Sequence, residues 1–426
     1  MQLTPSQNRL ATLLLALMVG CMVLSIVLYP DKSFEASING LNVWWNFVFP
    51  ALLPFLILFE ILLGLGAIHG LGVMLDPFMR LCFRLPGTGG LAMAMSAAAG
   101  PPAGAKVTAE LKKQGLIDRN EGERLLAVSY LCSPMFIVAV VGAGFLGSAE
   151  FGAKLLVIHY SSFLAAGLIL RLLWTLQPPL SRHRRAGQPQ ARSDSLMRRA
   201  ASAMIKARHM DGRTFGKLLG DAVITSVQNL MMVGGYIIMF SVVLNVLHLT
   251  RIADAISAFA NLAGRLAGMP ESFAIHVPAG LLEMHLGTYA ASLTKGPAHW
   301  TAAFIGAALA WGGLAVFFQT RSLTYSADLG LGAFLQGRLI HSACAFVLTL
   351  WLWNPLGRLA KLLLPWPVFS LFSPVPVAPA FAGSSSGWLP YSVLSLWIAS
   401  GLILTNSVIL MAVISFILQK FHLHDR

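Results

Sequence analysis

The composition of the chain excludes a soluble globular domain. Of its 426 residues, 56% are hydrophobic and only 11% are Asp, Glu, Lys or Arg, whereas roughly a quarter of the residues in soluble domains are charged. The formal net charge of +13 would suggest nucleic-acid binding in a polar protein, but this chain has too little polar surface for such basic patches. We therefore expect a membrane protein, with the lipid bilayer and not nucleic acid as its surroundings.

Taken in chain order, eight stretches are long and apolar enough to cross a bilayer, which requires about 20 helical residues. Five of them carry no charge: residues 10–30, 125–147, 222–247, 300–320 and 388–419. Three contain a single charged residue: 41–66 with Glu60, 155–174 with Arg171, and 334–353 with Arg338. The first stretch lacks the small-residue cleavage site of a signal peptide and is expected to be retained. The sequence thus predicts an all-α polytopic membrane protein with about eight transmembrane helices.

The positions of the basic residues predict the orientation. If the chain starts in the cytoplasm, most of the 30 Lys and Arg residues fall in cytoplasmic segments, as the positive-inside rule requires. Both termini are then cytoplasmic. The most basic stretch, residues 176–217, is predicted to be a cytoplasmic linker, either a solvated positive loop or a contact for anionic lipids.

The two halves of the chain share a sequence echo that indicates an internal repeat. Phe78-x-x-Leu81-x-x-Arg84-Leu85-x-Gly87 recurs as Phe259-x-x-Leu262-x-x-Arg265-Leu266-x-Gly268. Each copy follows a long span and precedes a Gly/Ala-rich stretch and two more spans, but the predicted membrane direction of the two units is opposite. Inverted repeats of this kind are typical of secondary transporters that expose one central site alternately to each side. We predict five parts: an N-terminal helix and outer loop (1–40), a first repeat (41–175), the linker (176–217), a second, inverted repeat (218–354), and an outer loop with a C-terminal helix (355–426).

Each repeat contains a stretch that is apolar but unable to form one continuous helix. In residues 89–105 the run from Gly100 to Gly104 (GPPAG) must turn, since proline lacks the N–H and clashes with the preceding helical turn. Its counterpart, residues 272–293, carries Gly280, Glu283, His285 and Gly287 near the expected turn. We predict two re-entrant hairpins whose tips face a cavity near the membrane midplane, because irregular backbone is tolerated at that depth only where protein or water satisfies it.

Two spans that follow the hairpins are also predicted to be interrupted, one at Ser133-Pro134 and the other at Gly312-Gly313. A helix that restarts at Ser133-Pro134 would present unpaired N–H groups and the positive end of its dipole to the cavity. This arrangement favours an anionic or hydrogen-bond-accepting ligand. The alternative is a proline kink without a functional role.

These residues resemble bacterial membrane proteins built on the nucleoside-recognition, or gate, domain, and in particular the sporulation integral membrane protein family, which includes spore dipicolinate transporters. The resemblance rests on GPPAGAK (100–106), the segment 121–147, GLLEMHLG (280–287) and WGGLAVFFQ (311–319). It implies a transporter-like fold with two gate repeats, transfer of a small aromatic dicarboxylate, and a place in the bacterial plasma membrane, or the outer forespore membrane in a spore former. Pro101 replaces the usual aromatic residue of the tip, and Tyr130 and Leu131 stand where polar residues are expected. Because of these differences, the resemblance predicts the fold better than it predicts the substrate.

Buried polar residues supply the candidate binding groups, because an ionisable side chain in a span costs about 2.5 to 3.5 kcal/mol on insertion scales. Glu283 is the leading candidate to hold a coupling proton or cation or to bind substrate; the alternative is a structural tie. For Glu60, a functional role and a structural role at the cytoplasmic interface are equally compatible with the sequence. Arg338 is expected to extend to the cytoplasmic interface, and His159 and His341, at similar places in the two repeats, are expected to be packed and hydrogen-bonded. The predicted substrate-binding residues are Gly100, Pro102, Gly104, Ser133, Pro134, Gln228, Asn229, Glu283, His285, Gly287 and Gln319.

The sequence therefore predicts a secondary-type transporter of a small anionic or aromatic metabolite, such as a dipicolinate-like dicarboxylate. Its energy source would be a proton or sodium ion gradient, the gradient of the substrate itself, or a partner ATPase. A nucleoside transporter and a non-transporting assembly factor or receptor are the alternatives; the last of these predicts a tightly packed interior without a cavity. The sequence contains no HExxH or P-loop motif, and its GSSSG run (383–387) falls in an expected outer loop and not in a nucleophile elbow. Its four cysteines show no paired spacing. We expect no enzymatic activity, metal or cofactor, and a homodimer is compatible with the sequence.

Overall fold

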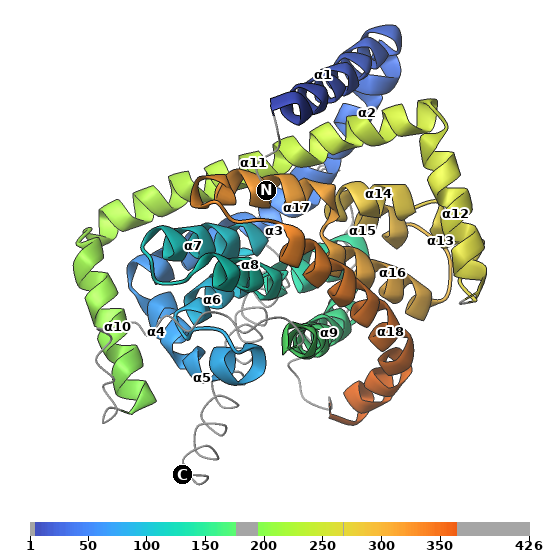
Figure 1. Ribbon diagram of the computed structural model, residues 1–426. Coiled ribbons are helices and arrows are strands. Elements are labelled where there is room, and N and C mark those ends of the chain that lie inside the picture. Colours follow the sequence, from blue (N-terminus) through green and yellow to red (C-terminus); the bar gives the residue numbers. More distant parts are fainter. Residues whose placement is uncertain (1–4, 176–194, 267, 364–426) are drawn as a thin grey trace, which may run out of the picture.

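A computed structural model describes residues 5–175, 195–266 and 268–363, and within these ranges the chain is helical and forms no strand. The first range holds α1 (Pro5–Leu28), α2 (Pro30–Val43), η1 (Trp44–Val48), α3 (Phe49–Gly64), α4 (Ala67–Met74), α5 (Asp76–Phe78), η2 (Met79–Phe83), α6 (Gly89–Ala99), α7 (Pro101–Lys113), α8 (Arg119–Val128), η3 (Phe136–Phe145) and α9 (Ala149–Thr175). The others hold α10 (Leu196–Asp211), α11 (Phe215–Leu249), α12 (Ile252–Leu266), α13 (Glu271–Ala274), α14 (Val277–Leu282), α15 (Met284–Ser292), α16 (Ala298–Trp311), α17 (Gly313–Thr324), η4 (Tyr325–Ala327) and α18 (Gly332–Leu363). The predicted all-α class is confirmed (Figure 1).

Five of the predicted spans coincide with helices long and apolar enough to cross a membrane. These are Pro30–Gly64, Ala149–Thr175, Phe215–Leu249, Ala298–Ala327 and Gly332–Gly357. The first predicted span falls on α1, and the last, 388–419, lies outside the described residues. The length and composition of these helices are consistent with a polytopic membrane protein, whereas the total of eight spans stays a prediction.

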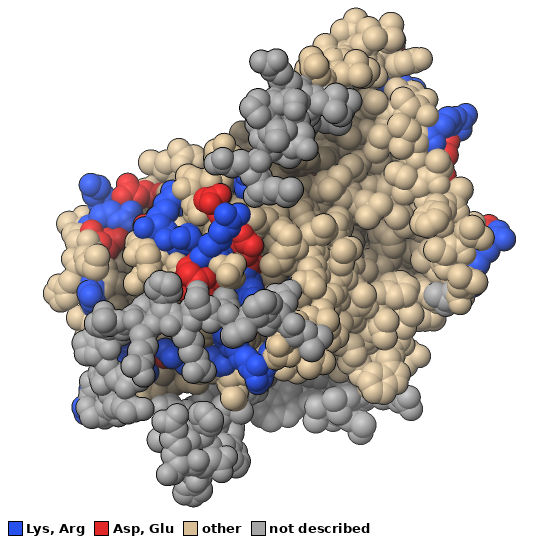
Figure 2. Space-filling model, viewed as in Figure 1, with Lys and Arg blue, Asp and Glu red and all other residues tan. Residues whose placement is uncertain are grey.

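Charged side chains are separated into two groups on the face shown in Figure 2. One group lies over α7, α8 and α10. The other lies along α12 at the opposite edge of the view, with the ion pair Arg251–Asp254 at the junction with α11 and the ion pair Arg265–Glu271 at the end next to α13. An uncharged band separates the two groups. This distribution fits a molecule whose apolar band faces lipid and whose charged ends face water on opposite sides of the membrane.

The helices of the two predicted repeats pack against each other at their interrupted elements. Helix α7 of the first repeat lies against α17 of the second, and α15 of the second contacts η3 of the first. Helices α9 and α18, the last of each repeat, also pack together, and α16 lies beside both. The repeats therefore contact each other both along the continuous helices α9 and α18 and at the places where their helices are broken.

Part of the predicted linker is a helix. Residues 176–194 lie outside the described residues, but α10 packs against α4 with Leu196 and Ala200 buried. The close approach depends on two glycines: a Cβ on Gly66 would lie 2.2 Å from the carbonyl oxygen of Met204, and one on Gly70 would lie 3.2 Å from that of Ala200. The abundance of basic residues concealed this helix at the sequence level.

Candidate functional site

The first chain reversal is confined to one residue, Gly100. Its φ of 90° and ψ of 176° lie where residues with a side chain are strained. Helix α7 then begins directly with Pro101 and Pro102, whose missing N–H groups are not needed in a first helical turn. The predicted turn is confirmed, but the sequence analysis placed Pro101 to Gly104 in the turn and the structure places them in the helix. Whether this hairpin is re-entrant in the membrane stays a prediction.

The predicted interruption at Ser133-Pro134 is confirmed. Helix α8 ends at Val128, residues 129–133 are not helical, and a new helix starts at Pro134. The Ser133 hydroxyl accepts the N–H of Phe136 (3.2 Å), which is the side-chain contact of an N-cap. Upstream, the Ser96 hydroxyl of α6 accepts the N–H of Leu131 (3.0 Å). The non-helical segment is therefore held by the first hairpin, and a capped helix N-terminus follows it.

The second hairpin turns at Glu283, between α14 and α15. One carboxylate oxygen accepts the N–H of Leu286 (2.9 Å), and the other lies 2.5 Å from Nδ1 of His285. Glu283 is thus the N-cap of α15, and both of its oxygens are occupied. Nearby, Gly312 and Gly313 separate α16 from α17 with φ angles of 85° and 82°. A Cβ on Gly313 would lie 2.8 Å from the Cα of Glu283, so these two interruptions are in contact.

A buried arginine joins the interruptions of the two repeats. Arg338 of α18 is 1% exposed, donates from Nη2 to the carbonyl oxygen of Ala127 (2.8 Å) and from Nη1 to that of Ala310 (3.1 Å). These carbonyls lie in the last turns of α8 and α16, where backbone acceptors lack partners within the helix and the dipole is negative. The guanidinium carbon lies 4.0 Å from the ring centre of Tyr130. The prediction that Arg338 extends to the interface is wrong, because two helix ends offer it acceptors inside the protein.

The two histidines at similar positions in the repeats lie beside this arginine. Nε2 of His159 accepts the N–H of Cys132 (3.4 Å), and Nε2 of His341 lies 3.3 Å from the carbonyl oxygen of His159. Their ring centres are 4.8 Å apart. Both side chains are buried, and the prediction that they are packed and hydrogen-bonded is confirmed.

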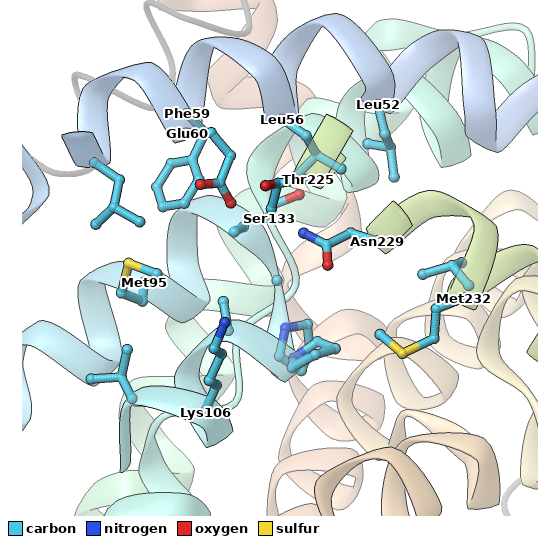
Figure 3. A pocket seen from close by; sticks show the side chains of 18 of the residues that line it. Leu52, Leu56, Phe59, Glu60, Met95, Lys106, Ser133, Thr225, Asn229 and Met232 are labelled. Carbon is cyan, nitrogen blue, oxygen red and sulfur yellow. The ribbon is translucent and has the colours of Figure 1, made fainter. Parts of the chain in front are cut away.

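A cavity of about 920 Å³ opens beside the interrupted helices (Figure 3). Its walls come from both predicted repeats and from α10 of the linker. Its lining includes Leu52, Phe55, Phe59, Glu60, His69, Met95, Gly100, Pro101, Pro102, Ala103, Lys106, Glu110, Cys132, Ser133, Phe136, Asp211, Arg213, Thr225, Asn229, Met232, Tyr236, Glu283, Met284, His285, Val316 and Gln319. This volume falls within the range of small-molecule sites, which is about 300 to 1,000 Å³.

Most of the predicted binding residues are brought together at this cavity. Those that line it are Gly100, Pro102, Ser133, Asn229, Glu283, His285 and Gln319. Gly104, Pro134, Gln228 and Gly287 do not line it. Gly104 and Gly287 lie where hairpin helices touch, since a Cβ on Gly104 would lie 2.7 Å from the Cβ of Ser96 and one on Gly287 2.3 Å from the Cα of Gly280. Gln228 and Asn229 are both exposed, but only Asn229 borders the cavity, as expected when neighbouring helical side chains point in different directions.

The sequence analysis missed the cations of the cavity. Lys106 lies two residues after Gly104 on α7, and among the described residues no hydrogen-bond or ion-pair partner reaches it. Its position at the end of the GPPAGAK motif, on the helix that leaves the turn, was the available signal. Arg213, by contrast, is bonded to Asp211 and to Asp221 (2.9 Å), and its side-chain hydrogen bond holds the pKa of Asp211 below the usual range. The positive charge without a partner in the cavity is thus Lys106.

Long apolar helices, paired interruptions and a ligand-sized cavity beside them are features of an integral membrane protein. The chain is similar to the sporulation integral membrane protein YlbJ of Bacillus subtilis (strain 168), with 37% identity over 349 residues that cover 82% of this chain and 84% of the relative. The chain therefore belongs to the sporulation integral membrane protein family. No family model matches the chain, and no solved structure matches it. The relation to gate domains stays a resemblance.

Proposed function

We propose that the protein is a secondary-type transporter that moves a small anionic, aromatic metabolite, such as a dipicolinate-like dicarboxylate, across a bacterial membrane. The observation that carries this proposal is the cavity shared by the two predicted repeats. Its lining includes the first turn at Gly100, the helix start at Ser133 and the second turn at Glu283. An assembly factor with a packed interior would have no need of such a space.

The polar groups of the cavity favour an anion. Lys106 offers an ammonium group without a partner among the described residues, and the helix that starts after Ser133 offers N–H groups at the positive end of its dipole. Phe55, Phe136 and Tyr236 supply aromatic surface for a ring. A flat aromatic dicarboxylate satisfies both kinds of contact.

The arrangement also supports alternating access. Each hairpin packs on an interrupted helix of the other predicted repeat, α7 on α17 and α15 on η3. Movement of the two hairpins against these interrupted helices would therefore change the walls of the cavity on both sides of the substrate. We place this site near the membrane midplane between the two turns.

Replacing Lys106 with Gln tests the proposal. Purified protein in liposomes should take up labelled dipicolinate, and Lys106→Gln should raise KM about ten-fold or more, because a hydrogen bond to a charged group contributes roughly 1.5 to 3 kcal/mol. Lys113→Gln is the matched control, since Lys113 is an exposed lysine of the same helix outside the cavity. Its KM should stay at the wild-type value.

Three outcomes would contradict the proposal. Equal KM values for both lysine variants would remove Lys106 from the site. Competition by nucleosides and not by dicarboxylates would favour nucleoside transport. No uptake or binding of small anions or nucleosides by correctly inserted protein would favour the assembly factor.

A further inference from the structure

The cavity holds one carboxylate that differs from all its other acidic groups. Glu60 lies in α3, within the candidate span Pro30–Gly64, and it is half-buried. No described residue makes a hydrogen bond or ion pair with it. The other cavity carboxylates all have partners: Glu110 with Gln114 (2.8 Å), Asp211 with Arg213, and Glu283 with His285 and Leu286. An ionisable group without a partner is costly within a span and calls for a function.

The charged groups around Glu60 come from few elements. From α7 come Lys106 and Glu110, from α4 comes His69, and from the end of α10 and the start of α11 come Asp211, Arg213 and Asp221. The other elements that pack on α3, namely η1, η3 and α6, carry no charged residue. Arg213 is already neutralised by its two aspartates. Lys106 is therefore the cavity cation that no carboxylate pairs with among the described residues, and it acts electrostatically on Glu60.

Figure 3 shows how the two groups share the space. Glu60 extends from α3 and Lys106 from α7, and both side chains point into the cavity, with Ser133 and Asn229 beside them. They do not form an ion pair with each other, although both Lys106 and Arg213 act electrostatically on Glu60. A substrate carboxylate can thus reach Lys106 without first breaking a salt bridge.

We propose that Glu60 is the proton-binding group that couples substrate movement to a proton gradient. This inference rests on the proposed transport function and names its coupling ion. When a substrate carboxylate binds Lys106, the charge of Glu60 is no longer balanced, and its carboxylate takes up a proton from water on the open side. When the substrate leaves on the other side, Lys106 again attracts the carboxylate, and the proton returns to water there. One proton therefore moves with each substrate, in the same direction.

Glu283 is less suited to this role, although the sequence made it the leading candidate. One of its oxygens accepts the N–H of Leu286 and caps α15, and the other lies 2.5 Å from Nδ1 of His285. Protonation would weaken these contacts and disturb the second turn. Glu60 can gain a proton without breaking a bond to any described residue.

Transport driven by a pH gradient tests the inference. In liposomes with an imposed pH gradient, the wild type should accumulate labelled dipicolinate above its equilibrium level, and Glu60→Gln should lose this accumulation while it still exchanges internal for external dipicolinate. Glu35→Gln is the matched control, because Glu35 lies in the same candidate span as Glu60 but outside the cavity, where it pairs with Lys32 (3.4 Å). It should accumulate like the wild type.

A second measurement uses the wild type alone and does not depend on the folding of a variant. Calorimetric titration of purified protein with dipicolinate, in buffers of different ionisation enthalpy, should show uptake of about one proton per bound molecule by linkage. Binding without proton uptake would overturn the inference, as would gradient-driven accumulation by Glu60→Gln or loss of its exchange in folded protein. A wild type that neither binds nor transports small anions would instead overturn the proposed function.

Discussion

Replacing Arg338 with Met should destabilise the protein more than any other single change at an arginine of the described residues. The substitution removes the donors to the carbonyl oxygens of Ala127 and Ala310, which are 2.8 and 3.1 Å away. Each unsatisfied buried acceptor costs about 1 to 3 kcal/mol, and the breaking of a buried charged network commonly costs about 3 to 5 kcal/mol. Heating detergent-solubilised protein and measuring the folded fraction by size-exclusion chromatography should show a lowered midpoint.

Two further variants make this prediction specific. Arg321→Met removes an exposed arginine that also donates to a backbone carbonyl, that of Leu329 (3.0 Å), and should change the midpoint little. Arg338→Lys keeps the charge but lacks the planar fork that reaches two acceptors, so its stability should lie between wild type and Arg338→Met. Equal midpoints for Arg338→Met and Arg321→Met would show that the two helix ends do not depend on the guanidinium.

A methyl group at Gly287 should disrupt the second hairpin. A Cβ there would lie 2.3 Å from the Cα of Gly280 and 2.6 Å from its nitrogen, and backbone atoms cannot yield as a flexible side chain can. Helices α14 and α15 would have to separate, which would move Glu283 and the wall of the cavity. Gly287→Ala should therefore lower the thermal midpoint and reduce dipicolinate uptake several-fold.

Gly280→Ala is the control for this prediction. Its Cβ would meet the Phe304 ring at 3.4 Å, an ordinary contact distance. Both variants add one methyl group to the α14–α15 hairpin. A difference in thermal midpoint or uptake between them therefore measures the effect of the backbone clash at Gly287. If Gly287→Ala kept both wild-type stability and wild-type uptake, the close approach of α14 and α15 would not be needed.

The sequence predicted those features that depend on composition and on proline or glycine. Long apolar runs placed the spans, and the interruptions at Gly100, Ser133 and Gly312 followed from residues that cannot continue a helix or that favour its end. These signals are local, because they reflect what a few consecutive residues can adopt. Binding residues predicted from these signals were largely correct in position, since seven of them line one cavity.

Features that depend on contacts between distant residues could not be predicted in this way. Arg338 binds carbonyls that lie 211 and 28 residues away, and no local pattern distinguishes it from an arginine that extends to the interface. Helix α10 was concealed by its many basic residues, and its close packing on α4, which Gly66 and Gly70 permit, joins segments far apart in the sequence. Gly104 and Gly287 were taken for binding residues, whereas their missing side chains serve helix packing. A glycine requirement alone does not reveal whether a ligand or another helix occupies the space.

The bonds of Arg338 also restrict which parts of the molecule can move. Because one guanidinium holds the ends of α8 and α16, these two helices and α18 form a common frame, and they cannot separate without leaving a buried charge without its partners. In the proposed transport cycle, the mobile elements would then be the two hairpins and α3, which border the cavity. Among the described residues, none of these elements makes a hydrogen bond to Arg338. The three helices joined by Arg338 would then form a static scaffold, and the elements around the cavity would open and close it.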